Sequence, residues 1–142
     1  MNVSPSDPAS AGWLPLDNDG YASLIGPLWH RLDTDGATPR FAMLADRRHV
    51  NFQGIVHGGM LMSFADTALG VTVWELASRQ PCVTVQFGMQ FLEAVHVGDF
   101  IEVDVEVLRR SRSIVFVRGT LRCGTKPVGS VDGVWKMLRG KA

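Results

Sequence analysis

GIVHGGMLMSFADTALGVTVW, residues 54–74, is the stretch of sequence that decides the fold. Its residues are almost all apolar or small, and its length suits one long helix, which we expect over roughly residues 58–78. Asp66 is the only acidic side chain in it. Removing a carboxylate from water costs several kcal/mol unless hydrogen bonds or a shifted pKa offset that cost. Asp66 is therefore the first candidate for a functional side chain, although it could also be a structural acid that hydrogen-bonds neighbouring backbone.

The predicted helix begins at His57-Gly58-Gly59. The first peptide N–H groups of a helix have no partner within the helix and carry partial positive charge, so they can polarise an electrophile that lies beyond the helix end. The two glycines could instead form a flexible loop end that permits close packing. On the first interpretation, one segment carries both a carboxylate and an electrophile-polarising helix end.

Composition and charge narrow the class of protein. A chain of 142 residues suits one domain with a single core. Its formal net charge is zero, so we expect neither nucleic acid nor an anionic membrane as a partner. Cys82 and Cys123 fall in strand-like segments without CxxC spacing or nearby histidines, so we expect buried, reduced thiols and no metal site. The N-terminus, MNVSPSDPASAG, lacks the basic start and apolar core of a signal peptide, which predicts a cytoplasmic protein.

The residues before the helix divide into two parts. The first dozen are rich in Pro, Ser and Ala, so we expect residues 1–19 to be disordered or loosely attached and the folded domain to span residues 20–142. A short helical turn is expected from Tyr21, with a break at Gly26-Pro27. A hairpin follows, with a DTDG turn at residues 33–36 and a second strand over residues 40–44.

After the helix the hydrophobic pattern changes to a period of two residues. The alternating segments are residues 83–92, 100–109, 113–123 and 127–138. In FIEVDVEV the alternation of apolar and acidic residues is typical of a strand with one buried and one solvated face. Turn residues separate the segments, so we expect a four-stranded antiparallel meander. With one or two earlier strands, the sequence predicts an α+β fold in which an antiparallel sheet of five to six strands surrounds one long helix.

The spacing of Asn51, His57-Gly58-Gly59, Asp66 and Thr84 resembles that of the hotdog-fold acyl-CoA thioesterases, in particular the phenylacetic-acid-degradation type. The resemblance extends over residues 20–138. It implies the hotdog fold, a sheet wrapped around a central helix, and homodimers whose sheets join edge to edge, with association into homotetramers left open. It also implies hydrolysis of coenzyme A thioesters without a cofactor.

The rise of a helix constrains how such a site could form. Asp66 lies eight residues beyond Gly58, a separation of about 12 Å along one helix. Attack on a carbonyl needs the reacting groups about 3 to 3.5 Å apart, so the two residues must come from different chains. An antiparallel pair of helices at a two-fold axis would bring each Asp66 towards the other chain's Gly58, giving two equivalent sites.

The two faces of the helix differ in side-chain size. Small residues share the face of Asp66 and leave room for a substrate or a partner, whereas larger apolar residues form the opposite face, which we expect to be core. The first set contains Gly59, Ser63 and Gly70, and the second contains Leu61, Phe64, Ala68 and Val71. We expect Trp29, Trp74 and Trp135 to lie in the core or at an interface.

Candidate roles follow from the chemistry of a thioester. The Gly58 N–H would stabilise the oxyanion, and Asp66 would either activate water as a general base or attack the carbonyl directly, an alternative that stays open. The resemblance implies that Asn51 positions the water or the carbonyl and that the Thr84 hydroxyl assists the water. We expect His57 to orient the loop.

Substrate-binding residues are predicted at three places. Gly59 and Ser63 face the predicted site, and the apolar residues Leu24, Ile25, Pro27 and Leu28 suit a medium-chain or aromatic acyl group equally well. Arg109, Arg110 and Arg112 surround a hairpin turn and could bind the coenzyme A phosphates, or could simply be solvated.

Two other functions stay open. A hydratase or dehydratase on the same fold would use His57 and Asp66 as a proton-transfer pair. A non-catalytic acyl-CoA binding or sensing module would keep the pocket without the chemistry.

Overall fold

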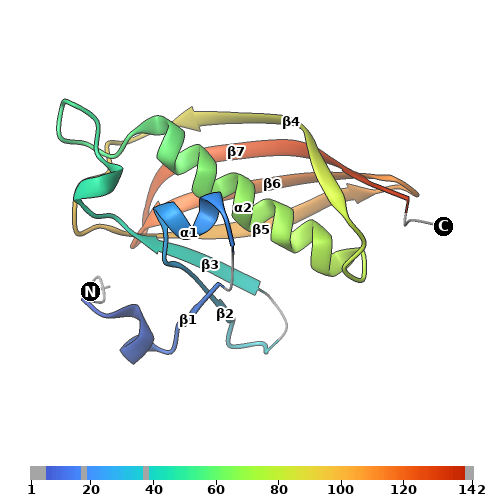
Figure 1. Cartoon of the computed structure of the whole chain (residues 1–142), viewed down its shortest axis with the longest axis horizontal. Coiled ribbons are helices and arrows are strands. Elements are labelled where there is room, and N and C mark those ends of the chain that lie inside the picture. The colour runs from blue at the N-terminus through green and yellow to red at the C-terminus, as the bar shows by residue number, and fades with distance from the viewer. Residues whose placement is uncertain (1–5, 17–18, 37–38, 140–142) are drawn as a thin grey trace.

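The computed structural model describes residues 6–16, 19–36 and 39–139. One antiparallel sheet curves around the long helix α2 (Gly58–Leu76), as Figure 1 shows. The helix ends two residues earlier than predicted because Ser78 and Arg79 have positive φ angles of 53° and 65°, which lie outside the right-handed helical region.

The sheet has seven strands in the order β1-β2-β3-β5-β6-β7-β4. The strands are β1 (Leu14–Pro15), β2 (Leu28–Leu32), β3 (Pro39–Leu44), β4 (Cys82–Phe91), β5 (Phe100–Arg110), β6 (Ile114–Cys123) and β7 (Lys126–Met137). Short helical elements precede or join them, namely η1 (Pro8–Ala11), α1 (Tyr21–Ile25) and η2 (Arg47–His49).

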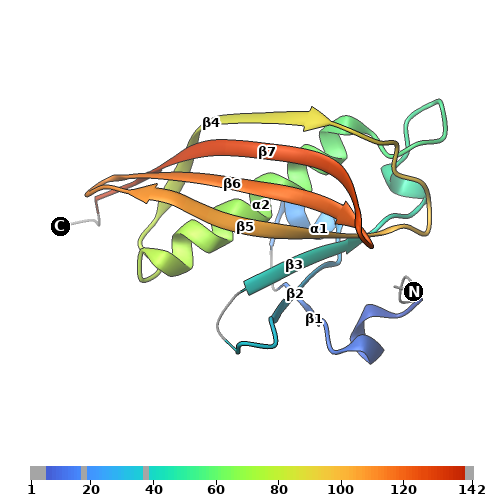
Figure 2. The same ribbon diagram turned by 180° about the vertical axis from the view of Figure 1, so that it is seen from behind.

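The predicted meander holds for β5, β6 and β7, but the position predicted for β4 is wrong. β4 pairs with β7, at the far edge of the sheet from β3, as the view from behind in Figure 2 shows. The connection over residues 92–99 is too long for a tight hairpin, and the buried Val95 anchors it by accepting a hydrogen bond from the Val56 N–H (2.8 Å). A period of two residues identifies the buried face of a strand but not its neighbour.

The sheet exceeds the predicted five to six strands because β1 arises from the segment that was expected to be loosely attached. Trp13, next to β1, is only 3% exposed and packs edge-on against Phe100, with ring centroids 5.4 Å apart. The Arg31 guanidinium lies 4.3 Å from the Trp13 ring centroid. The expectation of loose attachment is therefore wrong for residues 8–16, where one aromatic anchor outweighs the polar composition. Residues 1–5, 17 and 18 lie outside the described residues, and the domain boundary at residue 20 stays a prediction.

The core lies between α2 and the concave face of the sheet. The helix face predicted as core is buried at Leu61, Phe64 and Ala68, and Val71 packs against its border. Trp135 of β7 is in the same core, whereas Trp74 is partly exposed on α2. The opposite, small-residue face of α2 is less buried, with Ser63, Asp66 and Gly70 half-buried and Gly59 exposed.

Candidate active site

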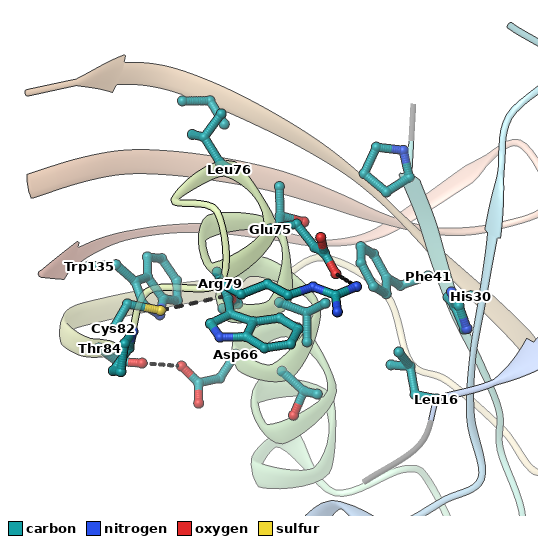
Figure 3. Close-up of a pocket in the computed structure, with 18 of the residues that line it drawn as sticks. Leu16, His30, Phe41, Asp66, Glu75, Leu76, Arg79, Cys82, Thr84 and Trp135 are labelled. Atoms are coloured by element: carbon teal, nitrogen blue, oxygen red, sulfur yellow. Dashed lines mark hydrogen bonds and ion pairs between the residues drawn. The ribbon is translucent and has the colours of Figure 1, made fainter. Parts of the chain in front are cut away.

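Asp66 lies midway along α2 on the wall of an open cleft of about 1280 Å³. Its carboxylate Oδ1 accepts a hydrogen bond of 2.7 Å from the Thr84 hydroxyl of β4, drawn in Figure 3. Oδ2 has no hydrogen-bond partner among the described residues. Asp66 is half-buried, so the acid lies at the border of the cleft rather than inside the core. One oxygen is held in place and the other is available to a ligand or a water molecule.

Cys82 lies beside this pair in the same cleft. Burial raises the pKa of the Cys82 thiol, and the nearby Asp66 carboxylate raises that pKa further. Its thiol also donates a long contact of 3.9 Å to the Gly70 carbonyl. The thiol therefore stays protonated at neutral pH and is a poor nucleophile. Cys82 and Cys123 are both unpaired and half-buried, in partial agreement with the buried thiols that were expected.

The N-terminus of α2 leaves one peptide N–H open. His57 caps the helix, because its Nδ1 accepts the Gly59 N–H (2.8 Å) and its carbonyl accepts the N–H groups of Met60 and Leu61. The Gly58 N–H has no acceptor within the described parts of the chain. A Cβ at position 58 would lie 3.1 Å from the Phe91 ring, so this ring borders the open N–H. The capping role of Nδ1 agrees with the expectation that His57 orients the loop.

Asn51 begins the loop that leads to this helix end. Its side-chain Oδ1 accepts the N–H groups of Gln53 (2.9 Å) and Ile55 (3.4 Å), and its own N–H donates to the Ile55 carbonyl (2.8 Å). These bonds fix the loop as an Asx-type turn. The amide Nδ2 makes no hydrogen bond to any described residue, so it can donate to a substrate.

The two halves of the predicted site line different clefts. Asp66 and Thr84 line the larger cleft, whereas His57, Gly59 and Ser63 line a second cleft of about 510 Å³ at the start of α2. The two sets of lining residues have no member in common. Within one protomer, Asp66 therefore does not reach the open N–H of Gly58. This is the separation that the rise of the helix predicts.

The wall of the second cleft is held by a clamp of Asp46, Arg48 and His49 that the sequence did not predict. Arg48 donates to the carbonyls of Leu24 (2.8 Å) and Gly26 (2.6 Å), and the ring of His49 hydrogen-bonds the Ile25 carbonyl (2.7 Å). Asp46 caps η2, accepting the Arg48 N–H (2.8 Å) and pairing with its guanidinium (2.9 Å). The sequence signal was Asp46 followed three residues later by His49, whose Nδ1 accepts the Asp46 N–H (3.0 Å) in a capping box.

The stabilisation that Asp46 provides to this clamp should be lost at low pH. Partial burial raises the pKa of Asp46, but hydrogen bonds from Arg48 outweigh it and hold that pKa below its ordinary value. A carboxyl with a lowered pKa stabilises the fold fully above its unfolded pKa, and this contribution is lost as pH falls through the folded pKa. We expect Asp46→Ala to lower the free energy of unfolding by about 1 kcal/mol at pH 7. In urea titrations the difference from the parent should shrink below pH 4, and a difference that is constant with pH would contradict the ion pair.

Tyr21 joins α1 to the same cleft. Its hydroxyl lies 2.9 Å from the Ser63 hydroxyl, which itself donates to the Gly59 carbonyl (2.8 Å). Tyr21 therefore donates to Ser63, and Ser63 lies on the cleft wall with both hydrogen-bonding directions in use. The sequence offered no signal for this contact between distant segments.

The other predicted substrate-binding residues are dispersed. Leu24 and Ile25 line the second cleft, but Pro27 lines a separate cleft of about 440 Å³. The prediction for Leu28 is wrong, because its side chain is 2% exposed within the core.

The arginine turn lies at the C-terminal end of α2. Arg110 donates to the Leu76 carbonyl (3.0 Å) and so satisfies a carbonyl of the last helical turn. Arg109 and Arg112 are exposed. Two of the three arginines are thus available to a solvent-borne anion.

The described part of the chain contains no group of three or more His, Cys, Asp or Glu side chains arranged to hold a metal ion. Within the same residues, no helix combines the length and apolar character needed to span a bilayer.

Comparison with known families identifies the class of protein. A family model described as the thioesterase superfamily matches residues 53–130, the segment that carries α2, Asp66 and Thr84. The chain belongs to this superfamily, and the predicted hotdog fold is confirmed. It is a hydrolase of the thioesterase class.

Individual relatives agree with this assignment. A Pseudomonas aeruginosa protein named as a candidate esterase, PA0474, is 32% identical over 128 residues, which cover 89% of this chain and 95% of that protein. Two solved structures share the fold at 21% identity. BH2602 of Bacillus halodurans, solved with CoA, has a TM-score of 0.76 and covers 89% of this chain and 83% of that one. The E. coli PaaI protein from the phenylacetic acid degradation operon has a TM-score of 0.73, with 87% and 88% covered.

Proposed function

We propose that this protein is an acyl-CoA thioesterase that acts as a homodimer. In each site, Asp66 of one subunit serves as base or nucleophile and the Gly58 N–H of the other subunit holds the oxyanion. The observation that carries this proposal is the pair of open groups on α2, the Asp66 Oδ2 on the larger cleft and the Gly58 N–H at the start of the helix, beside the His57 and Gly59 that line the second cleft. The CoA in the BH2602 structure favours a CoA ester as the substrate.

The chemistry follows from these positions. As water attacks the thioester carbon, Asp66 takes a proton from the water and negative charge develops on the carbonyl oxygen. The preorganised Gly58 N–H stabilises that charge, and collapse of the intermediate breaks the carbon–sulfur bond to release CoA and the free acid. In the nucleophilic alternative, Asp66 attacks the carbonyl carbon and the carbon–sulfur bond breaks, which expels CoA and leaves a mixed anhydride. Water then hydrolyses this anhydride to the free acid and restores the Asp66 carboxylate. The free Nδ2 of Asn51 could donate a further hydrogen bond to the substrate.

The edge of the sheet supports the dimer. β4 forms one edge of the sheet. Two of its apolar side chains are exposed, Val85 at 59% and Val83 at 43%. Exposed apolar edge strands readily pair with another strand. Pairing of β4 with its copy would place two α2 helices side by side on one continuous sheet. We expect light scattering to give a mass of two chains or of a multiple of two.

The hydratase alternative is disfavoured by the geometry. The Nδ1 of His57 accepts the Gly59 N–H (2.8 Å) as the helix cap, so this nitrogen is not available to exchange a proton with a substrate. A binding module without chemistry would need neither a positioned acid nor an open helix N–H.

Thr84 is expected to position the acid. Thr84→Val keeps the β-branched shape but removes the hydroxyl that holds Oδ1, so we expect kcat/KM to fall about 10-fold. Thr84→Ser restores the donor and should recover most of the loss. Equal losses in the two variants would show that strand packing, not the hydrogen bond, is responsible.

The direct test is free-thiol release from short, medium, long and aryl acyl-CoA esters by the purified protein. Hydrolysis of at least one ester class at an enzymatic rate is expected. Absence of thiol release across the whole panel would overturn the proposal.

A further inference from the structure

Trp135 lies on the floor of the cleft that contains Asp66. The residue is only 1% exposed, and its ring packs edge-on against Phe87 with centroids 6.1 Å apart. Its indole N–H nevertheless has no hydrogen-bond acceptor among the described residues. The Nε1 atom is not among the fully buried, unpartnered side-chain atoms of the described part of the chain, so this N–H opens to the cleft.

Three contacts place the donor beside the proposed catalytic acid. Thr84 and Trp135 are directly opposite in the β4–β7 ladder, and Thr84 in turn holds Asp66. Gly70 follows Asp66 by one helical turn, about 6 Å along α2. A Cβ at position 70 would lie 3.4 Å from the Trp135 Nε1, so this nitrogen faces the space that a side chain at Gly70 would occupy. Figure 3 shows Trp135 and Thr84 on the same side of α2 as Asp66.

Nearby protein groups do not supply an acceptor. The Asp66 Oδ1 is bonded to Thr84, and the Gly70 carbonyl receives the Cys82 thiol. In the free protein water can pair with this N–H, and a ligand that fills the cleft must replace that water with an acceptor of its own. A substrate carbonyl carbon attacked with the help of Asp66 lies within about 3 to 3.5 Å of the attacking atom. The Trp135 N–H lies beside Gly70, one helical turn beyond Asp66, so it would face substrate atoms a few bonds from the carbonyl carbon.

We infer that the Trp135 N–H binds an oxygen acceptor on the acyl group, so that the enzyme prefers acyl-CoA esters with a hydroxyl or keto oxygen a few bonds from the thioester. This inference rests on the proposed function. When a plain alkyl chain covers this N–H it removes the water and leaves the donor unpaired, a desolvation cost that an oxygenated chain avoids. Sites built to pair with a polar substrate group reject analogues that lack it.

The test compares matched substrates on the purified protein. We expect kcat/KM for 3-hydroxyhexanoyl-CoA and 3-oxohexanoyl-CoA to exceed that for hexanoyl-CoA by about 10- to 100-fold. In Trp135→Phe, which keeps a ring but lacks the N–H, the ratio should fall towards one. Phe87→Leu changes the packing of the same ring and retains the N–H, so it should preserve the ratio.

A second variant covers the case in which Trp135→Phe does not fold. Gly70→Ala improves helix propensity and places a methyl group in front of Nε1, so it should also reduce the ratio. A parent ratio near one, or a ratio that survives Trp135→Phe or Gly70→Ala, would overturn the inference.

Binding separates this inference from the proposed function. Calorimetric titration of Asp66→Asn with the same esters is expected to give tighter binding of the oxygenated chains. Equal dissociation constants would overturn the Trp135 inference even if thiol release occurs. Loss of all thiol release by the parent, with the binding preference intact, would instead overturn the thioesterase proposal.

Discussion

Asp66→Asn is expected to reduce thiol release from the best acyl-CoA ester by about 10²- to 10⁴-fold in kcat while the protein stays folded. The asparagine Oδ1 can still accept the Thr84 hydroxyl, which now bonds the Asp66 Oδ1 at 2.7 Å, so the contact between α2 and β4 survives. The neutral amide can neither accept a proton from water nor attack a carbonyl. Steady-state thiol release gives the rate, and the thermal midpoint together with the light-scattering mass reports folding and assembly.

Glu75→Gln is the matched control for this result. Glu75 is a second acid on α2, lines the same cleft and pairs with Arg79 on the exposed side of the helix (3.3 Å). We expect its neutralisation to change kcat less than 3-fold, because exposed ion pairs contribute little. If both variants lose activity equally, the charge of the cleft is responsible rather than one catalytic acid. If Asp66→Asn keeps full activity, the catalytic assignment fails.

The sequence predicted the parts of the fold that depend on local periodicity. The helix and the long strands follow from which residues repeat at three to four positions and which alternate. Strand neighbours depend on tertiary contacts: β4 pairs with β7, so residues 92–99 join two strands that have β6 and β7 between them. Trp13 was missed for a related reason, since one buried ring can order a segment whose average composition is polar.

In the candidate site, too, the features set by local sequence were predictable and those set by tertiary contacts were not. Asp66 was identifiable as an isolated acid, and its separation from Gly58 followed from the helical rise. The Asp66–Thr84 bond joins residues 18 positions apart on different elements and was not predicted, although the family resemblance implied that both residues belong to one site. The clamp of Asp46, Arg48 and His49 was not anticipated, because its acceptors are backbone carbonyls at the end of α1.

Gly58→Pro is expected to lower kcat by about 10²- to 10³-fold, whereas Gly58→Ala should cost much less. Proline removes the open N–H but suits the first position of a helix, and the preceding His57 has the extended backbone (ψ 134°) that proline requires. Alanine keeps the N–H, and its Cβ would meet only the exposed, movable Phe91 ring at 3.1 Å. Equal losses in the two variants would point to packing at this glycine rather than to oxyanion stabilisation.

Combining the two inactive variants tests whether the site is shared between subunits. A dimer purified with one Asp66→Asn chain and one Gly58→Pro chain contains one site with both defects and one with neither, if acid and N–H come from different subunits. We therefore expect the mixed dimer to show about half of the activity of the unmutated protein, although each variant alone is nearly inactive. A mixed dimer of Asp66→Asn with the parent chain should also retain about half, and this controls for tags and subunit exchange. If the acid and the N–H acted within one chain, the doubly mutant mixture would be as inactive as either variant alone, because each chain would then carry a defect in its own site.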